Sequence, residues 1–239
     1  MMRLGASRRA VVGVLALAGV GSASAQDVLT YDAALGTLPQ GQGWTYSGAA
    51  TIPMSVSDGQ LHHGPTTYGG TSFWMVDLPT GTMDFAADTW SISALVQIDS
   101  GTFGNQSGFR RGGFNLGLND NAGRWIHAEM NHAQIGIRND NTGLSDPAVA
   151  FDLADGFHTV MLVAGPGGGS LLVDGVTLMT LPLGTAAGAD NRAHFGDSTI
   201  LGNYTGHIRE VHLVPGPGAL ALLAAAAGVG ARRRLRLPR

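Results

Sequence analysis

The sequence predicts an all-β protein, a two-sheet antiparallel β-sandwich of the jelly-roll kind, and three observations carry this prediction. Asp58-Gly59 and Asp174-Gly175 each separate two apolar runs. Asp-Gly at such a place is a strong mark of a hairpin, because both central residues of a type I′ turn need positive φ. In residues 90–98 every second side chain is apolar, and the residues between them are Ser91, Ser93, Leu95 and Gln97, a period of two with one core face. Glycine is abundant at 37 residues, which suits a chain rich in turns.

The chain offers about a dozen short strands, with turns at the spacing typical of sandwiches. Residues 26–43 read as an extended arm with a short edge strand, which Leu35, Leu38 and Trp44 would dock. The Gly-rich residues 101–111 read as a loop. The expected strands are 50–56, 60–63, 73–78, 90–98, 113–118, 124–130, 134–138, 157–164, 170–173, 176–181, 192–195 and 207–213.

Residues 156–181 suggest a meander of three strands, 157–164, 170–173 and 176–181, which we place centrally in one sheet. The first of these strands is apolar on nearly both faces, so we expect it to be covered on both sides.

The register of one hairpin can be argued from parity. If Leu116 and Ile126 both face the core, pairing them preserves the alternation on both strands. This register sets Asn115 opposite His127 and Gly117 opposite Trp125, where the missing side chain would give the indole room.

Composition excludes several functions. Charged residues make up 13% of the chain and the net charge is −3, so the folded part has no field to attract nucleic acid. Cysteine is absent, which excludes disulfides and thiolate metal sites. A chain of this length suits one sandwich domain, which we place at residues 26–213.

Both ends carry targeting patterns. Residues 1–25 contain an arginine-bearing start, an apolar run at 10–20 and Ala23-Ser24-Ala25, which predicts a secretory signal peptide cleaved after Ala25. An internal hydrophobic helix is the alternative. Residues 214–239 contain Val214-Pro215-Gly216-Pro217, an apolar run at 219–231 and an arginine cluster. As a helix the run reaches about 20 Å, a marginal membrane span.

This C-terminal arrangement resembles the PEP-CTERM sorting tails of bacteria, which an exosortase processes, although Gly216 stands where the motif has glutamate. The resemblance implies export to the outer surface or extracellular matrix, with transient anchoring in the membrane through a C-terminal transmembrane helix. An uncleaved anchor helix and a helix of the soluble fold are the alternatives.

The stretch FHTVMLV…GGGSLLVDGV resembles a hairpin of concanavalin A-like lectin/glucanase domains, which include the laminin G-like group. The stretch HFGDST…HIREVHL resembles the last strands of these domains. This resemblance covers most of residues 32–213 in the order of elements. It implies a jelly-roll sandwich with one concave sheet on which glycans lie, although the family spans lectins, hydrolases, lyases and adhesive modules.

The candidate ligand-binding residues are Trp125, His127 and Glu129, which share one face of a strand, with Asn115 on the neighbouring strand. An indole stacks on a sugar ring, while amide, imidazole and carboxylate groups bind hydroxyls. A strand face that lies against a loop or open to water would explain the same pattern.

No residue is assigned a catalytic role. Glucanases of this family carry alternating carboxylates on one strand, whereas only Glu129 is present in the equivalent run here, and glycoside cleavage normally needs two. His62-His63 and Arg110-Arg111 match no lyase motif.

The sequence does not decide whether the protein binds a metal ion. His127 and Glu129 lack a third zinc ligand. The oxygen-rich turns at residues 139–143 and at Asp197-Ser198 suit Ca²⁺ as a possible cofactor, although such turns are common without metal.

The sequence therefore favours an exported, surface-sorted module that binds extracellular glycan or matrix without catalysis. A structural matrix protein without a small ligand and a polysaccharide hydrolase or lyase of the same fold remain as alternatives.

Overall fold

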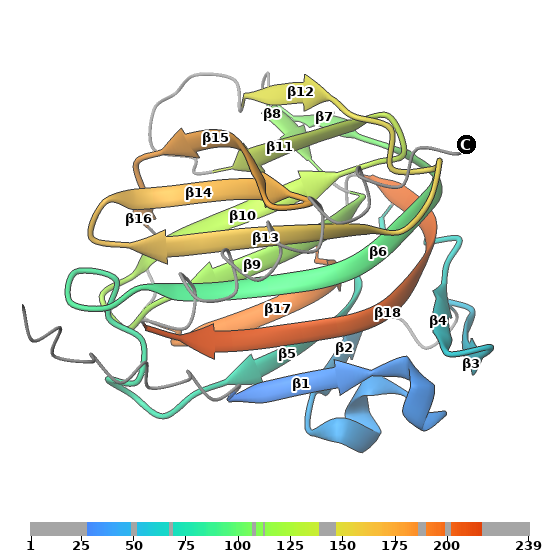
Figure 1. Ribbon diagram of the computed structural model, residues 1–239, viewed down its shortest axis with the longest axis horizontal. Coiled ribbons are helices and arrows are strands. Elements are labelled where there is room, and N and C mark those ends of the chain that lie inside the picture. Colours follow the sequence, from blue (N-terminus) through green and yellow to red (C-terminus); the bar gives the residue numbers. More distant parts are fainter. Residues whose placement is uncertain are drawn as a thin grey trace, which may run out of the picture.

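Two eight-stranded antiparallel sheets pack face to face in the computed structural model, which confirms the predicted sandwich (Figure 1). The structure describes residues 28–48, 52–66, 69–106, 109–111, 113–138, 147–185, 190–198 and 202–216, with the side chains of 104–106 and 109–111 excepted. The side chains between the sheets form one continuous hydrophobic core.

The first sheet faces the viewer in Figure 1. Its strands, in spatial order, are β15 (Val176–Leu181), β14 (Gly168–Val173), β13 (His158–Gly165), β6 (Trp90–Thr102), β18 (Asn203–Pro215), β4 (Gln60–His63) and β3 (Met54–Ser57), and β1 (Leu29–Asp32) pairs with β18 on the side away from β6.

The second sheet lies behind the first in Figure 1. Its order is β12 (Ala148–Ala150), β11 (Gln134–Arg138), β10 (Arg124–Met130), β9 (Phe114–Asn119), β17 (Arg192–Asp197), β5 (Ser72–Asp77) and β2 (Thr45–Gly48), and β16 (Gly184–Thr185) pairs with the start of β10. A separate hairpin joins β7 (Gly104–Gln106) to β8 (Phe109–Arg111), and two short 3₁₀ helices, η1 (Ala33–Leu35) and η2 (Pro39–Gln42), follow β1.

Both Asp-Gly turns adopt the backbone that the sequence predicts. Asp58 and Gly59 have φ of 52° and 66°, and Asp174 and Gly175 have φ of 49° and 80°. These values belong to type I′ turns, whose twist matches the twist of the strands that they join. Hence the hairpins β3–β4 and β14–β15 form at the places expected.

Alternation along β6 is also confirmed. Trp90, Ile92, Ala94, Val96 and Ile98 all point into the core and are at most 3% exposed.

The two sheets approach closely where β14 crosses β10, since a Cβ on Gly169 would lie 1.8 Å from Cδ1 of Ile126. The aromatic rings of Trp74 and Phe195 stack at 5.3 Å on the inner face of the second sheet.

Several local expectations are wrong. Leu35 is 66% exposed and does not dock the arm, whereas Trp44 is buried as expected. Residues 101–111 are not a loop throughout, because β6 continues to Thr102 and β7 and β8 form a hairpin. The meander β13–β14–β15 lies at one end of the first sheet, with β15 as its edge. Strands β2, β12 and β16 are too short or too glycine-rich for periodicity to reveal them.

The hairpin register is wrong by two residues. Leu116 pairs with Ala128, and Gly117 lies opposite His127. Asn115 consequently lies opposite Glu129, and Trp125 lies opposite Asn119. Parity survives a shift of two residues, so the inward and outward sets are nevertheless correct.

The predicted signal peptide at 1–25, the sorting tail beyond Gly216 and the turn at 139–143 all lie outside the described residues. In the part of the chain that the structure describes, no helix is long and apolar enough to cross a membrane.

His158 connects the β14–β15 turn to the loop before β13 through contacts with Asp174 and Asp155, which we call the histidine clasp. His158 Nδ1 lies 2.8 Å from Asp174 Oδ2, and His158 Nε2 lies 2.7 Å from Asp155 Oδ1. Burial alone would lower the pKa of His158, but the hydrogen bonds to Asp174 and Asp155 outweigh it and raise this pKa. The protonated imidazole therefore stabilises the folded state.

We expect the stabilisation by this clasp to be full below the unfolded pKa of histidine, about 6.5, and to vanish as pH rises through the raised folded pKa. His158→Gln should therefore lower the free energy of unfolding more at acid pH than at alkaline pH, by less than about 1 kcal/mol because the site is partly exposed. Urea unfolding at both pH values measures it. A pH-independent difference between the variant and the parent would refute the clasp.

Candidate functional site

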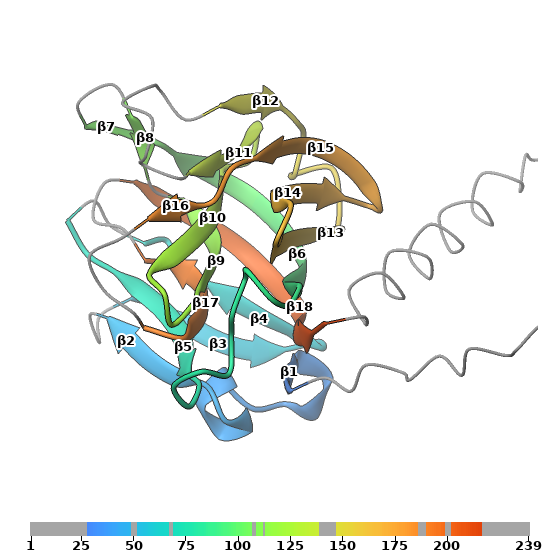
Figure 2. The same ribbon diagram turned by 90° about the vertical axis from the view of Figure 1, so that its left-hand side faces the viewer.

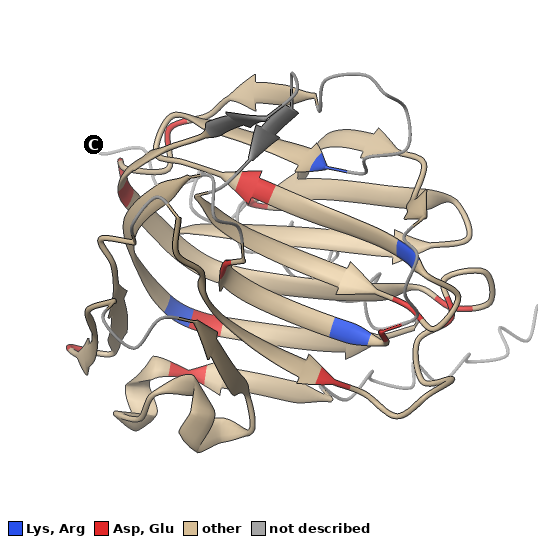
Figure 3. Cartoon of the chain, turned by 180° about the vertical axis from the view of Figure 1, so that it is seen from behind, with Lys and Arg blue, Asp and Glu red and all other residues tan. Residues whose placement is uncertain are grey.

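The outer face of the second sheet carries the predicted site residues. Figure 3 looks onto this face, where acidic and basic residues are scattered and do not form one charged patch. Trp125, His127 and Glu129 share this face of β10, as parity predicts. The structure adds two residues that the sequence analysis missed, Arg138 of β11 and His194 of β17.

Trp125, His127, Glu129, Arg138 and His194 form one row of contacting side chains across the sheet. The rings of Trp125 and His127 lie 4.7 Å apart, and those of His127 and His194 lie 4.6 Å apart. The Arg138 guanidinium lies 5.2 Å from the centre of the Trp125 ring. Its Nη1 also lies 3.4 Å from Glu129 Oε1, so the acid and the indole share one cation. Glu129 and His194 are 4% exposed, and buried polar side chains of this kind on an outer sheet face are an informative feature.

Gly117 explains how His194 reaches this row. A Cβ on Gly117 would lie 1.9 Å from Cε1 of His194, so the imidazole occupies the space that a side chain would fill. The register expected from the sequence placed the indole of Trp125 in this space, and that register is wrong. Burial, and then the charges of His127 and Arg192, hold the pKa of His194 well below its usual range. His194 is therefore a neutral ring at physiological pH.

Two polar atoms of this row are buried without a hydrogen-bond partner. Trp125 is 5% exposed and His194 is 4% exposed, and neither Trp125 Nε1 nor His194 Nε2 has a partner in the structure. A buried polar group that makes no hydrogen bond costs about 1–3 kcal/mol. Most buried polar groups in proteins are satisfied. Trp90 Nε1, on the inner face of the first sheet, shares this feature, so the two atoms point to a ligand only together with the row of aromatic and charged groups around them.

Asn115 plays a different part from the one predicted. Its Oδ1 accepts hydrogen bonds from the backbone N–H and the hydroxyl of Ser198, at 3.1 and 2.6 Å, and its Nδ2 donates to Gly113 O at 3.3 Å. The side chain is fully buried. Asn115 therefore anchors the end of β17 to β9 and has little capacity left for a ligand.

A small hollow adjoins Glu129. It has a volume of about 10 Å³ and is lined by Phe103, Glu129, Gly136, Ile137, Arg138, Pro147 and Ala148. That volume suffices for about one water molecule.

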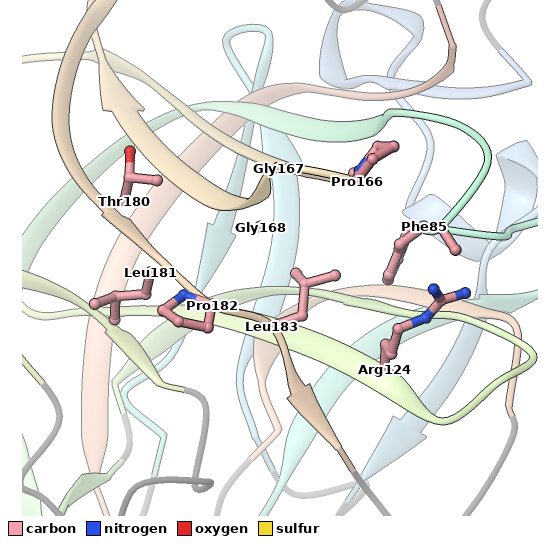
Figure 4. A pocket seen from close by; sticks show the side chains of 11 residues that line it. Phe85, Arg124, Pro166, Gly167, Gly168, Thr180, Leu181, Pro182 and Leu183 are labelled. Carbon is pink, nitrogen blue, oxygen red and sulfur yellow. The ribbon is translucent and has the colours of Figure 1, made fainter.

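A larger groove opens at one end of the sandwich, between the β13–β14 turn and the start of β10 (Figure 4). It measures about 560 Å³ and is mainly apolar, with lining from Phe85, Pro166, Pro182, Leu183 and other residues. Arg124 is its charged member. The guanidinium is bound by Asp120 at 2.6 Å and by Asp84, so its charge is already compensated.

The strands supply no pair of acids for glycoside cleavage. On the outer face of the second sheet the strands carry Glu129 on β10 and Asp77 on β5, which are separated by β9 and β17. Three strand spacings are about 14 Å, well beyond the 6.5–9.5 Å of inverting enzymes.

A serine–histidine pair lies between the sheets. Ser72 Oγ lies 2.6 Å from His63 Nε2, and the other ring nitrogen contacts the Tyr204 hydroxyl. All three side chains are at most 1% exposed, and burial lowers the pKa of His63 to about 3. A base this weak cannot activate a serine near neutral pH. We therefore interpret the cluster as a hydrogen-bonded part of the core.

The described residues contain no group of three His, Asp or Glu side chains that could hold a metal ion. Asp197 does not form the surface turn that we expected, because it ends β17 and is fully buried.

Comparisons with known proteins extend to the fold alone. No protein-family model and no curated protein matches the chain. Among solved structures, a carbohydrate esterase from the Shiga toxin-encoding bacteriophage phi24B matches with a TM-score of 0.58 and 15% identity, over 80% of this chain and 98% of that one. The chain shares a β-sandwich fold with this protein.

Weaker matches are the binding domain of botulinum neurotoxin DC in complex with rat synaptotagmin II (TM-score 0.48, 13% identity, 79% of this chain) and that of serotype D in complex with N-acetylneuraminic acid (0.47, 9%, 84%). This chain covers 48% and 50% of those domains, about half of their length.

Proposed function

We propose that the protein is a carbohydrate-binding module that acts without catalysis, through the outer face of its second sheet. The observation that carries this proposal is the pair of buried, unpartnered polar atoms, Trp125 Nε1 and His194 Nε2, in one row with the Arg138–Glu129 ion pair. Both atoms are covered by neighbouring groups, and the Arg138 guanidinium lies over the Trp125 ring, so in this proposal the Arg138 side chain moves aside when the ligand binds. Sugar hydroxyls both donate and accept hydrogen bonds, so one polyol could then satisfy the indole N–H, the imidazole and the flanking charges.

The phage protein named a carbohydrate esterase supports this class of ligand only coarsely, because the likeness is one of fold. Catalysis is not part of the proposal, since neither the strand acids nor the Ser72–His63 pair has the required geometry or basicity.

We expect Trp125→Phe to weaken glycan binding about tenfold, because it removes one N–H and keeps an aromatic ring. A glycan array followed by titration of the best binder measures the effect. Trp90→Phe is a matched control, since Trp90 also has a buried, unpartnered Nε1 but lies on the inner face of the first sheet.

Equal binding by parent and Trp125→Phe would place the ligand elsewhere. An array without any binder would favour the structural matrix role.

We also propose export and surface sorting, on the patterns at residues 1–25 and 214–239. In this proposal the C-terminal segment anchors the chain in the membrane transiently, and an exosortase-type enzyme processes it. Fractionation of cells that express the chain with and without residues 215–239 tests it, and full-length chain in the cytoplasm would contradict it.

A further inference from the structure

The outer face of the first sheet carries a patch that is buried although it points away from the core. It consists of Ser91 and Ser93 on β6, Met161 on β13, Leu172 on β14 and Val214 on β18, with exposures of 1%, 8%, 5%, 4% and 1%. The register makes the patch continuous, because Val214 pairs with Ser91, Ser93 with Met161, and Met161 with Leu172. It therefore crosses four neighbouring strands.

This degree of burial requires a cover. The second sheet packs on the inner face of the first, so a bare outer face would leave valine, leucine and methionine side chains open to water on one side. Among the described residues, no helix or strand lies over the patch (Figures 1 and 2). The strand pattern also predicted a cover here, because β13 is apolar on nearly both faces.

We propose that the apolar C-terminal segment, residues 219–231 of the same chain, packs across this patch. The described chain ends at Gly216, whose N–H donates to Thr89 O next to the start of β6. Val214 belongs to the patch and lies two residues before that end. The other terminus is less well placed, because it enters through β1, which pairs with β18 on the side away from β6.

Length and composition fit the patch. As a helix, residues 219–231 would extend about 20 Å. The centres of β18, β6, β13 and β14 span about 14 Å, so one such helix can cross all four strands. The segment contains only Ala, Leu, Val and Gly, and the two serines at the middle of the patch let small residues approach closely.

The segment lies on the other sheet from the proposed glycan site, so this inference does not depend on that function. A segment that packs on the sheet cannot span a membrane at the same time. Docking would therefore keep the apolar run out of water before the sorting machinery withdraws it.

The absence of cysteine from the chain makes a direct test possible. Ser93→Cys is introduced into the whole chain together with one cysteine at each position from 220 to 229 in turn. We expect at least one pair to form an intrachain disulfide, since this needs Cα atoms about 4.4–6.8 Å apart. Thr177→Cys, at an exposed position on the outer face of β15, is the matched control and should form none.

A second measurement uses single cysteines and a maleimide. Ser93→Cys should react at least about tenfold faster when Leu222→Asp and Leu223→Asp remove the apolar character of the segment, whereas Thr177→Cys should not change. The proposal is overturned if Ser93→Cys reacts as fast as Thr177→Cys in the parent background. A disulfide that forms only between two chains, or protection that needs lipid vesicles, would each overturn it too, in favour of another cover.

Discussion

Gly117→Ala should abolish ligand binding on the outer face of the second sheet and lower the free energy of unfolding by about 1–3 kcal/mol. The new methyl group would lie 1.9 Å from Cε1 and 2.5 Å from Nε2 of His194. A small shift of the imidazole cannot make room for the methyl group, because the centres of the His127 and Phe73 rings lie 4.6 and 5.8 Å from the centre of the His194 ring. The ring must leave the row, and the proposed site then loses the imidazole that it needs.

Chemical unfolding and glycan titration measure the two effects separately. Gly156→Ala is the control, since its Cβ would meet nothing within 4 Å. The double variant Gly117→Ala/His194→Ala should be about as stable as His194→Ala alone, because the methyl group then fills vacated space, yet it should still fail to bind. Full binding by Gly117→Ala would remove His194 from the site.

The faces of the strands were predictable because alternation is a local property. The inward sets of β6, β9 and β10 follow from period two, and all of them are buried as expected. The register of β9 against β10 was not predictable in the same way, since a shift of two residues leaves every side chain on its face. The turn decides it, and there Asp120 N donates to Arg124 O and closes a shorter loop than expected.

The site was predictable only in part, because it is assembled from strands far apart in the sequence. Trp125, His127 and Glu129 share one strand, so their common face could be predicted. His194 reaches them because β17 pairs with β9, and no local pattern encodes that pairing. Gly117 was the available signal, since a glycine inside a strand often marks a close approach.

Burial of Trp125 was likewise beyond local reasoning. An indole on an outer strand face is exposed unless another part of the chain lies against it. Here Arg138 comes from the neighbouring strand and contacts both the ring and Glu129. The stacking of a free indole on a sugar stays untested, and our proposal instead uses the unpartnered N–H group of Trp125.

Asp120→Asn should cause the other large effect, a loss of about 2–4 kcal/mol in the free energy of unfolding. The carboxylate is fully buried and accepts four hydrogen bonds, from the backbone N–H groups of Phe85, Ala122 and Arg124 at 3.0, 2.9 and 2.9 Å and from Arg124 Nε at 2.7 Å. An amide can keep two of these bonds through its oxygen. Its NH₂ group would then face the donors of Phe85 and Arg124.

Asp84→Asn is the matched control, because Asp84 contacts the same guanidinium but its side chain is 44% exposed. Solvent can replace that partner, so the control should lose much less stability than Asp120→Asn. Urea unfolding of the two variants compares them directly. If Asp84→Asn lowered the free energy of unfolding as much as Asp120→Asn, the exposed charge pair would stabilise this end of the sandwich. If Asp120→Asn lowers it much more, the buried carboxylate stabilises the β9–β10 turn and, through Phe85 and Arg124, one wall of the groove.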